Sequence, residues 1–148
     1  VASQRMPVLS RLLLAPDGSP VRGARPTGEL SGVEILTRRF TRTRVVVLGT
    51  CEGAAGRMVD GEGALSLATL FLRAGAGAVV ASYWPVEDRV HPVLVGLHRE
   101  LRRLRDPAAA LRAAQLEILA AEGENAPVRS WGAFVAVGGL VPGAAGES

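Results

Sequence analysis

The chain has 148 residues, of which 48% are hydrophobic and only 4% aromatic, which suits one domain with a core of aliphatic side chains. Its net charge is +3, and its basic residues are all Arg, spread along the sequence. No apolar run is long enough to cross a bilayer, and no secretory signal is recognisable, which argues against a membrane-spanning or exported protein. Since a single cysteine cannot form an internal disulfide, we expect a cytoplasmic protein.

In the first half of the chain, one continuous apolar run indicates a buried strand. Val45–Leu48 is rich in β-branched residues, as is typical of a strand covered on both faces of a parallel sheet. Before it, Leu12–Ala15 indicates a short strand that ends in a turn rich in Pro and Gly. The segment that follows predicts a short helix, capped by Thr27 or Ser31.

The second half of the chain alternates helices and strands. Asp106 and Pro107 fit the N-cap and first turn of a helix. In chain order we expect a helix over 65–72 that ends near Gly75, a buried strand over 78–82, a helix over 91–105, a helix from Pro107 to about Gly123 and a last strand over 131–137.

This order predicts a three-layer α/β domain with helices on both faces of one mostly parallel sheet. We expect that sheet to contain the strands near residues 12–14, 45–48, 78–82 and 134–137. Ligands of such sheets bind at the carboxyl ends of the strands. Cys51 comes just after one predicted strand, and Glu87 and Asp88 come after the next. Consecutive parallel strands are usually neighbours, so we expect these two strands side by side and these residues at one edge of the sheet.

Four arginines, Arg99, Arg102, Arg103 and Arg105, share a segment with apolar residues at helical spacing. This pattern is typical of an amphipathic helix, so we interpret the arginines as its solvated face. Nucleic-acid binding through that face is the weaker interpretation.

Cys51 follows a buried strand and precedes Glu52 and Gly53. A thiol at a glycine-rich turn suits a nucleophile, because backbone N–H groups around the turn, including that of Cys51, can stabilise an oxyanion. The alternative is that Cys51 is a small buried apolar side chain. No Cys/His cluster has metal-ligand spacing, and we expect no metal or organic cofactor.

Several motifs, in order, resemble the CHAT domain family of caspase-like and separase-like cysteine peptidases of clan CD. They are the segments 45–51, 61–68, 76–88, 109–115 and 131–138. The resemblance implies a caspase-like fold over residues 1–141, here its C-terminal part with N-terminal strands missing. Residues 142–148 are small and polar, so we expect them to form a flexible tail. CHAT peptidases are often joined to tetratricopeptide repeats, so other domains of a longer chain are expected partners.

One feature of the family is missing before Cys51. CHAT peptidases carry a catalytic histidine in a His-Gly motif upstream of the nucleophile, whereas His91 and His98 both follow Cys51 here. We expect the histidine to precede Val1, which would leave residues 1–148 inactive by themselves; the alternative is that this homologue has lost it.

Asp88 is the second candidate site residue. The stretch from Trp84 to Asp88 resembles a Trp-x-Val-x-Asp motif of separases and CHAT proteins, in which an acidic residue can line the pocket for a basic P1 side chain. A carboxylate there would pair with Arg or Lys of the substrate, and Trp84 would form a wall of the cleft. Asp88 as an N-cap of the helix near His91 is an equally balanced alternative.

The leading hypothesis is thus a cysteine endopeptidase that cleaves protein substrates, with Cys51 as nucleophile and Asp88 and Trp84 in the S1 pocket. The alternative is a non-catalytic CHAT-like interaction or scaffold module. A nucleotide-binding or anion-binding α/β domain is supported only by analogy of fold.

Overall fold

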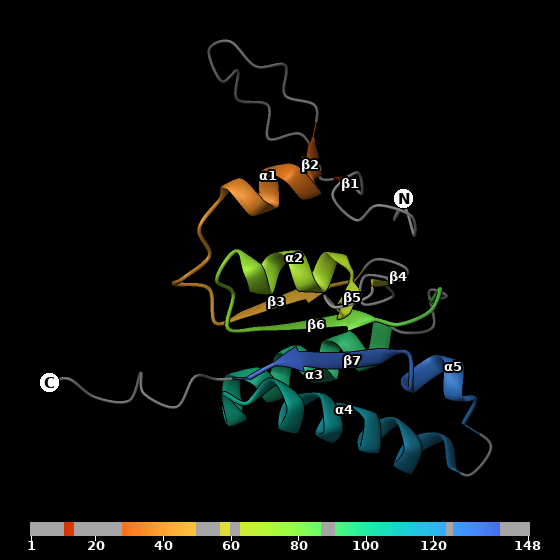
Figure 1. The fold of residues 1–148 in the computed structure, drawn as a ribbon. Helices are drawn as coiled ribbons and strands as arrows, with labels where there is room; N and C mark the ends of the chain where they lie inside the picture. Colours follow the sequence, from red (N-terminus) through yellow and green to blue (C-terminus); the bar gives the residue numbers. More distant parts are fainter. Residues whose placement is uncertain are drawn as a thin grey trace, which may run out of the picture.

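The computed structural model describes residues 11–13, 28–49, 57–59, 63–86, 91–123 and 126–139. Figure 1 shows how the elements in these ranges are arranged. The strands are β1 (Arg11–Leu13), β2 (Glu29–Ser31), β3 (Val45–Leu48), β4 (Arg57–Val59), β5 (Gly63–Leu65), β6 (Ala78–Ser82) and β7 (Phe134–Gly138). The helices are α1 (Gly32–Thr37), α2 (Leu67–Arg73), α3 (His91–Leu104), α4 (Pro107–Glu122) and α5 (Val128–Trp131).

A three-stranded sheet in the order β3-β6-β7 organises the molecule. β3 and β6 are parallel, with Val45 opposite Ala78 and Leu48 opposite Ala81. β6 and β7 are antiparallel, with Ser82 opposite Phe134. The α/β class is confirmed, but the described part of the sheet is mixed, so the expectation of a mostly parallel sheet holds for only one of its two strand pairs.

The direction of β7 follows from the pair of helices that precedes it. A single helix after β6 would return the chain to the start of that strand and favour a parallel neighbour. Here α3 and α4 form an antiparallel pair, so the chain comes back to the end of the sheet from which it left (Figure 1). The next strand must then run opposite to β6.

The central strand β6 separates two apolar clusters. All five of its residues are buried, and alternate side chains point to opposite faces. Val79 and Ala81 belong to a cluster with Ile35 of α1 and Leu70 of α2. Val80 belongs to a second cluster on the face of α3 and α4. Helices therefore cover both faces of the sheet (Figure 1).

The helices α3 and α4 approach each other closely at small residues. A Cβ atom added at Gly96 would lie 3.1 Å from the Cβ atom of Ala114. Arg99 of α3 pairs with Glu117 of α4, and Asp106 caps α4 by accepting hydrogen bonds from the N–H groups of the next turn. The predicted role of Asp106 as N-cap is confirmed.

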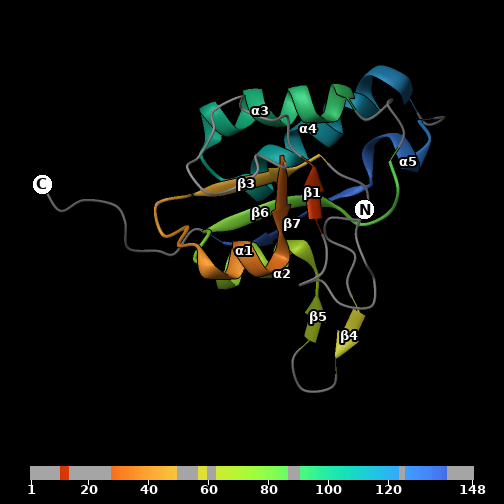
Figure 2. The same cartoon turned by 90° about the horizontal axis from the view of Figure 1, so that it is seen from above.

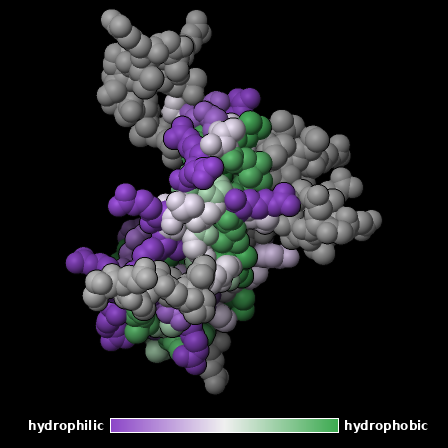
Figure 3. Space-filling view, turned by 60° about the vertical axis from the view of Figure 1, so that its left-hand side comes forward, coloured by the Kyte–Doolittle hydropathy of each residue, from purple (hydrophilic) through white to green (hydrophobic). Residues whose placement is uncertain are grey.

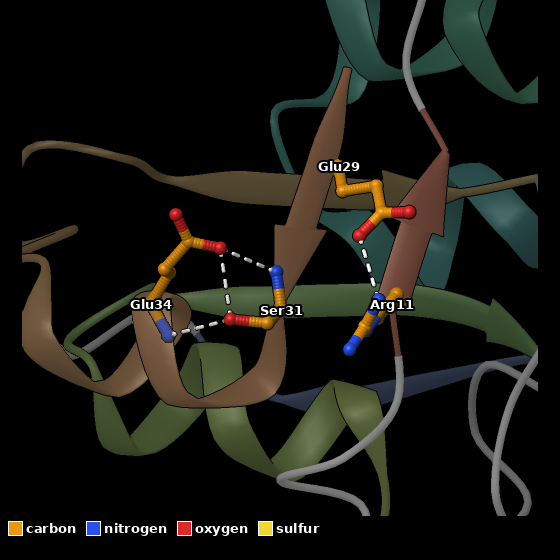
Figure 4. Close-up of polar contacts among 4 residues, drawn as sticks. All are labelled: Arg11, Glu29, Ser31 and Glu34. Atoms are coloured by element: carbon orange, nitrogen blue, oxygen red, sulfur yellow. Dashed lines mark hydrogen bonds and ion pairs between the residues drawn. The ribbon is translucent and has the colours of Figure 1, made fainter. Parts of the chain in front are cut away.

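The short helix α1 begins with a capping box (Figure 4). The Ser31 hydroxyl accepts a hydrogen bond from the Glu34 N–H at 3.2 Å. The Glu34 carboxylate accepts from the Ser31 N–H and the Ser31 hydroxyl, each at 2.8 Å. These bonds, the backbone one first, hold the pKa of Glu34 below its ordinary value of 4.5. Of the two predicted caps, Ser31 is thus the N-cap of this helix.

Two small sheets depart from the expected arrangement. β1 pairs antiparallel with β2 instead of joining the main sheet, and Arg11 and Glu29 form an ion pair across them at 2.9 Å (Figure 4). β4 and β5 form an antiparallel pair that projects beyond the main sheet in Figure 2. The expectation that the first strand joins the central sheet is wrong, and Trp131 lies in α5 rather than in the last strand.

Candidate functional site

The carboxyl ends of β3 and β6 lie side by side at one edge of the sheet. The parallel register places Leu48 opposite Ala81, so Gly49 and Ser82 continue the two strands next to each other. The prediction that these two strands are neighbours is confirmed. It carries the candidate site, because Cys51 follows β3 and Trp84–Asp88 follows β6 in the sequence.

The start of β7 completes this edge of the sheet. The Tyr83 N–H donates a hydrogen bond to the Ala133 carbonyl at 2.8 Å. The side-chain amide of Gln115 on α4 donates to the carbonyls of Trp131 and Phe134, at 3.1 and 3.3 Å. The start of β7 is therefore held from two directions, by the chain that leaves β6 and by the helix α4.

The beginning of α3 lies against the end of β3. A Cβ atom at Gly49 would meet the Cδ1 atom of Leu94 at 3.6 Å. This short distance places the first turns of α3 next to Gly49, two residues before Cys51 in the sequence. A larger side chain at position 49 would therefore contact Leu94.

Trp84 is half-buried and packs against the apolar cluster of α3 and α4. This cluster contains Val80, Val93 and Phe134. Much of the indole is therefore part of the core beneath the edge, whereas the preceding Tyr83 is 58% exposed. Such a position is compatible with the wall of a cleft, which stays a prediction.

Cys51 and Asp88 lie outside the described residues, and so does the Cys51 N–H that was expected to bind the oxyanion. Their roles, and the choice between a substrate pocket and a helix cap for Asp88, stay predictions. What the structure describes are the strands that lead to them.

The two histidines occupy different parts of α3. His91 is the first residue of the helix and is exposed. His98 lies two turns further on, where its Nδ1 atom is 2.7 Å from the carbonyl oxygen of Leu94. This contact ties the His98 imidazole to its own helix.

Within the described ranges, no group of three or more His, Cys, Asp or Glu side chains could hold a metal ion. In the same part of the chain, no helix combines the length and the apolarity needed to span a bilayer.

Sequence analysis missed the contribution of residues 131–134 to the edge of the sheet. Two consecutive helices before the last strand were the signal that this strand returns to the end where β6 terminates.

A family model described as the CHAT domain matches residues 1–139. The chain belongs to the CHAT domain family. CHAT domains are associated with caspase-like cysteine peptidases. A comparison with the curated proteins finds no match for this CHAT domain.

Proposed function

We propose that this CHAT domain is a cysteine endopeptidase domain of caspase-like, three-layer fold, with Cys51 as its nucleophile. The observation that carries the proposal is the parallel register of β3 and β6, Leu48 opposite Ala81. It supports a site in which the segments after both strands share one edge, the position at which open α/β sheets bind ligands. The family supports the type of chemistry.

In the proposed reaction, the Cys51 thiolate attacks the carbonyl carbon of the scissile peptide bond. The tetrahedral intermediate is stabilised by backbone N–H groups, among them that of Cys51. An imidazolium then protonates the leaving amine as the C–N bond breaks, leaving a thioester on Cys51. Water hydrolyses the thioester and restores the thiol.

The proposed reaction needs an imidazole, and residues 1–50 contain no histidine, since both histidines follow Cys51. His98 contacts the Leu94 carbonyl of its own helix, and His91 does not occupy the place of the family's histidine motif. We propose that the base stands in a His-Gly motif N-terminal to Val1. Residues 1–148 alone should then hydrolyse peptides at a negligible rate.

The proposed S1 pocket contains Asp88 as the group that selects a basic P1 side chain, with Trp84 as a wall. The half-buried position of Trp84 at the end of β6 supports this assignment. A poorly solvated carboxylate beside the nucleophile would pair bidentately with Arg and as a point charge with Lys.

The nucleophile is tested in the protein as it occurs naturally. Cys51→Ala should abolish peptide cleavage and labelling by an acyloxymethyl ketone probe, without changing the circular dichroism spectrum. His91→Ala and His98→Ala are matched controls, and each should keep activity within about twofold. Retention of cleavage in Cys51→Ala would refute the proposal.

The pocket is tested with peptide substrates that differ only at P1. Asp88→Asn should lower kcat/KM for a P1 Arg substrate by about 30-fold or more, and Glu87→Gln should leave it unchanged. Equal losses for P1 Arg and P1 Leu substrates would contradict a selective pocket. A loss of thermal stability without a change in specificity would instead indicate a helix cap.

One observation favours a second candidate function, a non-catalytic CHAT-like scaffold. It is the absence of a histidine before Cys51 in this sequence. The scaffold predicts that the natural protein lacks an upstream His-Gly motif and that Cys51→Ala leaves partner binding and phenotype intact.

A further inference from the structure

Three arginines line one cavity at the end of the sheet opposite the candidate active site. Arg44 directly precedes β3, Arg102 lies in the last turn of α3, and Arg105 follows that helix. The cavity has a volume of about 370 Å³, and its other described lining residues are Val45 and Leu101. We name this group the arginine pocket. In Figure 1, β3 begins at the left-hand end of the sheet.

The charges of the arginine pocket are not neutralised by acidic side chains of the described residues. The neighbouring Arg99 and Arg103 pair with Glu117 and Glu100. The described residues offer no such ion pair to Arg44, Arg102 or Arg105, all of which are exposed. Figure 3 turns this end of the molecule toward the viewer and shows hydrophilic side chains beside hydrophobic ones.

The helix dipole explains only part of this arrangement. Cations are favourable in the last turn of a helix, which accounts for Arg102. The partial negative charge there is about half an elementary charge, small beside three guanidinium groups. Arg44 precedes a strand and cannot be explained in this way. The pocket therefore keeps a strong preference for anions.

Arg105 adopts a backbone conformation that L residues rarely use. Its φ is 57°, and its N–H donates a hydrogen bond to the Leu101 carbonyl at 3.2 Å. Glycine is the usual residue at such a helix end, because a side chain is strained there. An arginine at this position is therefore unfavourable for the backbone, which indicates that the guanidinium itself has a use.

The backbone that carries Arg44 is held by the central strand. The Arg44 carbonyl accepts a hydrogen bond from the Ala78 N–H at 3.0 Å. A Cβ atom at Gly77 would lie only 2.8 Å from the Arg44 carbonyl oxygen. Arg102 belongs to a helix of 14 residues. Two of the three guanidinium groups thus start from rigid elements, which limits the entropy lost when a ligand binds.

We propose that the arginine pocket binds the phosphoryl group of a small phosphorylated molecule. Guanidinium groups match phosphate oxygens bidentately, which makes Arg the preferred residue for phosphate recognition. The volume lies within the range of about 300–1,000 Å³ that is common for small-molecule sites, and Val45 and Leu101 provide an apolar surface beside the charges. The site is separate from the proposed peptidase chemistry and does not depend on it.

Isothermal titration of the protein with inorganic pyrophosphate, and separately with AMP, tests the proposal. Arg105→Gly removes the guanidinium and relieves the left-handed strain. It should weaken binding by about tenfold or more, while the melting temperature stays the same or rises. Arg102→Gln should weaken binding similarly. Arg38→Gln makes the same charge change at the end of α1, on the other face of the sheet, and should leave the affinity unchanged.

Three results would overturn the proposal. The first is no detectable binding of either pyrophosphate or AMP at low ionic strength. The second is an equal loss in Arg38→Gln, or equal affinity for sulfate, since both indicate non-selective attraction of anions. The third is binding of a phosphoserine peptide with no binding of pyrophosphate or AMP, which would assign the pocket to a protein partner instead.

Discussion

The two faces of the central sheet are covered by helices of very different length. On one face, α3 and α4 have 14 and 16 residues; on the other, α1 and α2 have 6 and 7. Isolated helices shorter than about 12–15 residues are marginal in water. The short helices must therefore depend on their caps and on a few buried side chains, whereas the long pair can depend on contact with each other.

Truncation of a core side chain should have the largest effect on stability. The part of the molecule that it destabilises should differ between the two faces of the sheet. Leu97 of α3 and Ile35 of α1 are both fully buried. Truncation of either to Ala should lower the free energy of unfolding by about 2–5 kcal/mol. By hydrogen exchange, Ile35→Ala should expose amides of α1 and α2 more than those of α3, because the short helices can open locally.

The surface variant Leu116→Ala is the control for this prediction, since its side chain is 45% exposed. It should change the stability by less than about 0.5 kcal/mol. Equal exchange of α1 and α3 amides in Ile35→Ala would mean that the two faces unfold as one unit, and that the contrast between them has no energetic basis.

The close approach of α3 and α4 should produce the next largest effect. At Gly96 a Cβ atom would already lie 3.1 Å from that of Ala114. Gly96→Val should destabilise the protein by about 1–3 kcal/mol through overpacking, although helix propensity alone favours Val over Gly. Urea denaturation measures the loss, and Ala114→Gly in the same chain should recover part of it.

The matched control for Gly96→Val is Gly139→Ala, because nothing lies within 4 Å of a Cβ atom at Gly139. This control should be close to neutral. A neutral Gly96→Val would show that the helices can separate without loss, and that the long-helix face is not held by this contact.

The cap of α1 should have a smaller effect. Ser31→Ala removes the hydroxyl that accepts the Glu34 N–H and should cost about 1 kcal/mol. Ser31→Asn keeps a capping oxygen and should restore most of the stability. Thermal unfolding followed by circular dichroism compares the three proteins. If Ala and Asn were equivalent at position 31, the capping box would not contribute.

The smallest effect should be a dependence of this cap on pH. The pKa of Glu34 is lowered in the folded protein, first by the hydrogen bond from the Ser31 N–H. Its contribution to stability is therefore complete above the ordinary value of 4.5 and decreases as the pH falls through the lower, folded pKa. Glu34→Gln should lower the melting temperature at neutral pH, and this difference should shrink well below pH 4.5.

The sequence predicted the elements with long or strongly marked patterns. β3 is an apolar run followed by Gly49, and β6 is one preceded by Gly77. α4 starts at an Asp-Pro pair, which is typical of a helix N-terminus. Of the short strands, β1 was predicted from its run of Leu, whereas β2, β4 and β5 were missed. Glu29–Ser31, for example, is too short and too polar to show a period. β4 and β5 flank an Asp-Gly pair, a hairpin signal that was available in the sequence.

Of the candidate active site, only the arrangement of the two strands that lead to it could be predicted and checked. The neighbouring positions of β3 and β6 followed from their order, and the structure confirms them. The roles of Cys51 and Asp88 stay predictions. The arginine pocket was not foreseen, because Arg44 and Arg102 are far apart in sequence. Only the antiparallel return of α3 along β3 brings them to one cavity.

The hydrogen bond between the Tyr83 N–H and the Ala133 carbonyl, 2.8 Å long, has a consequence for how this protein can be altered. The chain leaves the sheet after β6 and returns to it before β7 at adjacent points. The two long helices therefore lie in a connection whose two ends are close together. Adding the same number of helical turns to α3 and to α4 would lengthen this connection and leave the pairing of β6 with β7 unchanged. The α3–α4 segment is therefore a place where a longer helical hairpin can be grafted without disturbing that pairing.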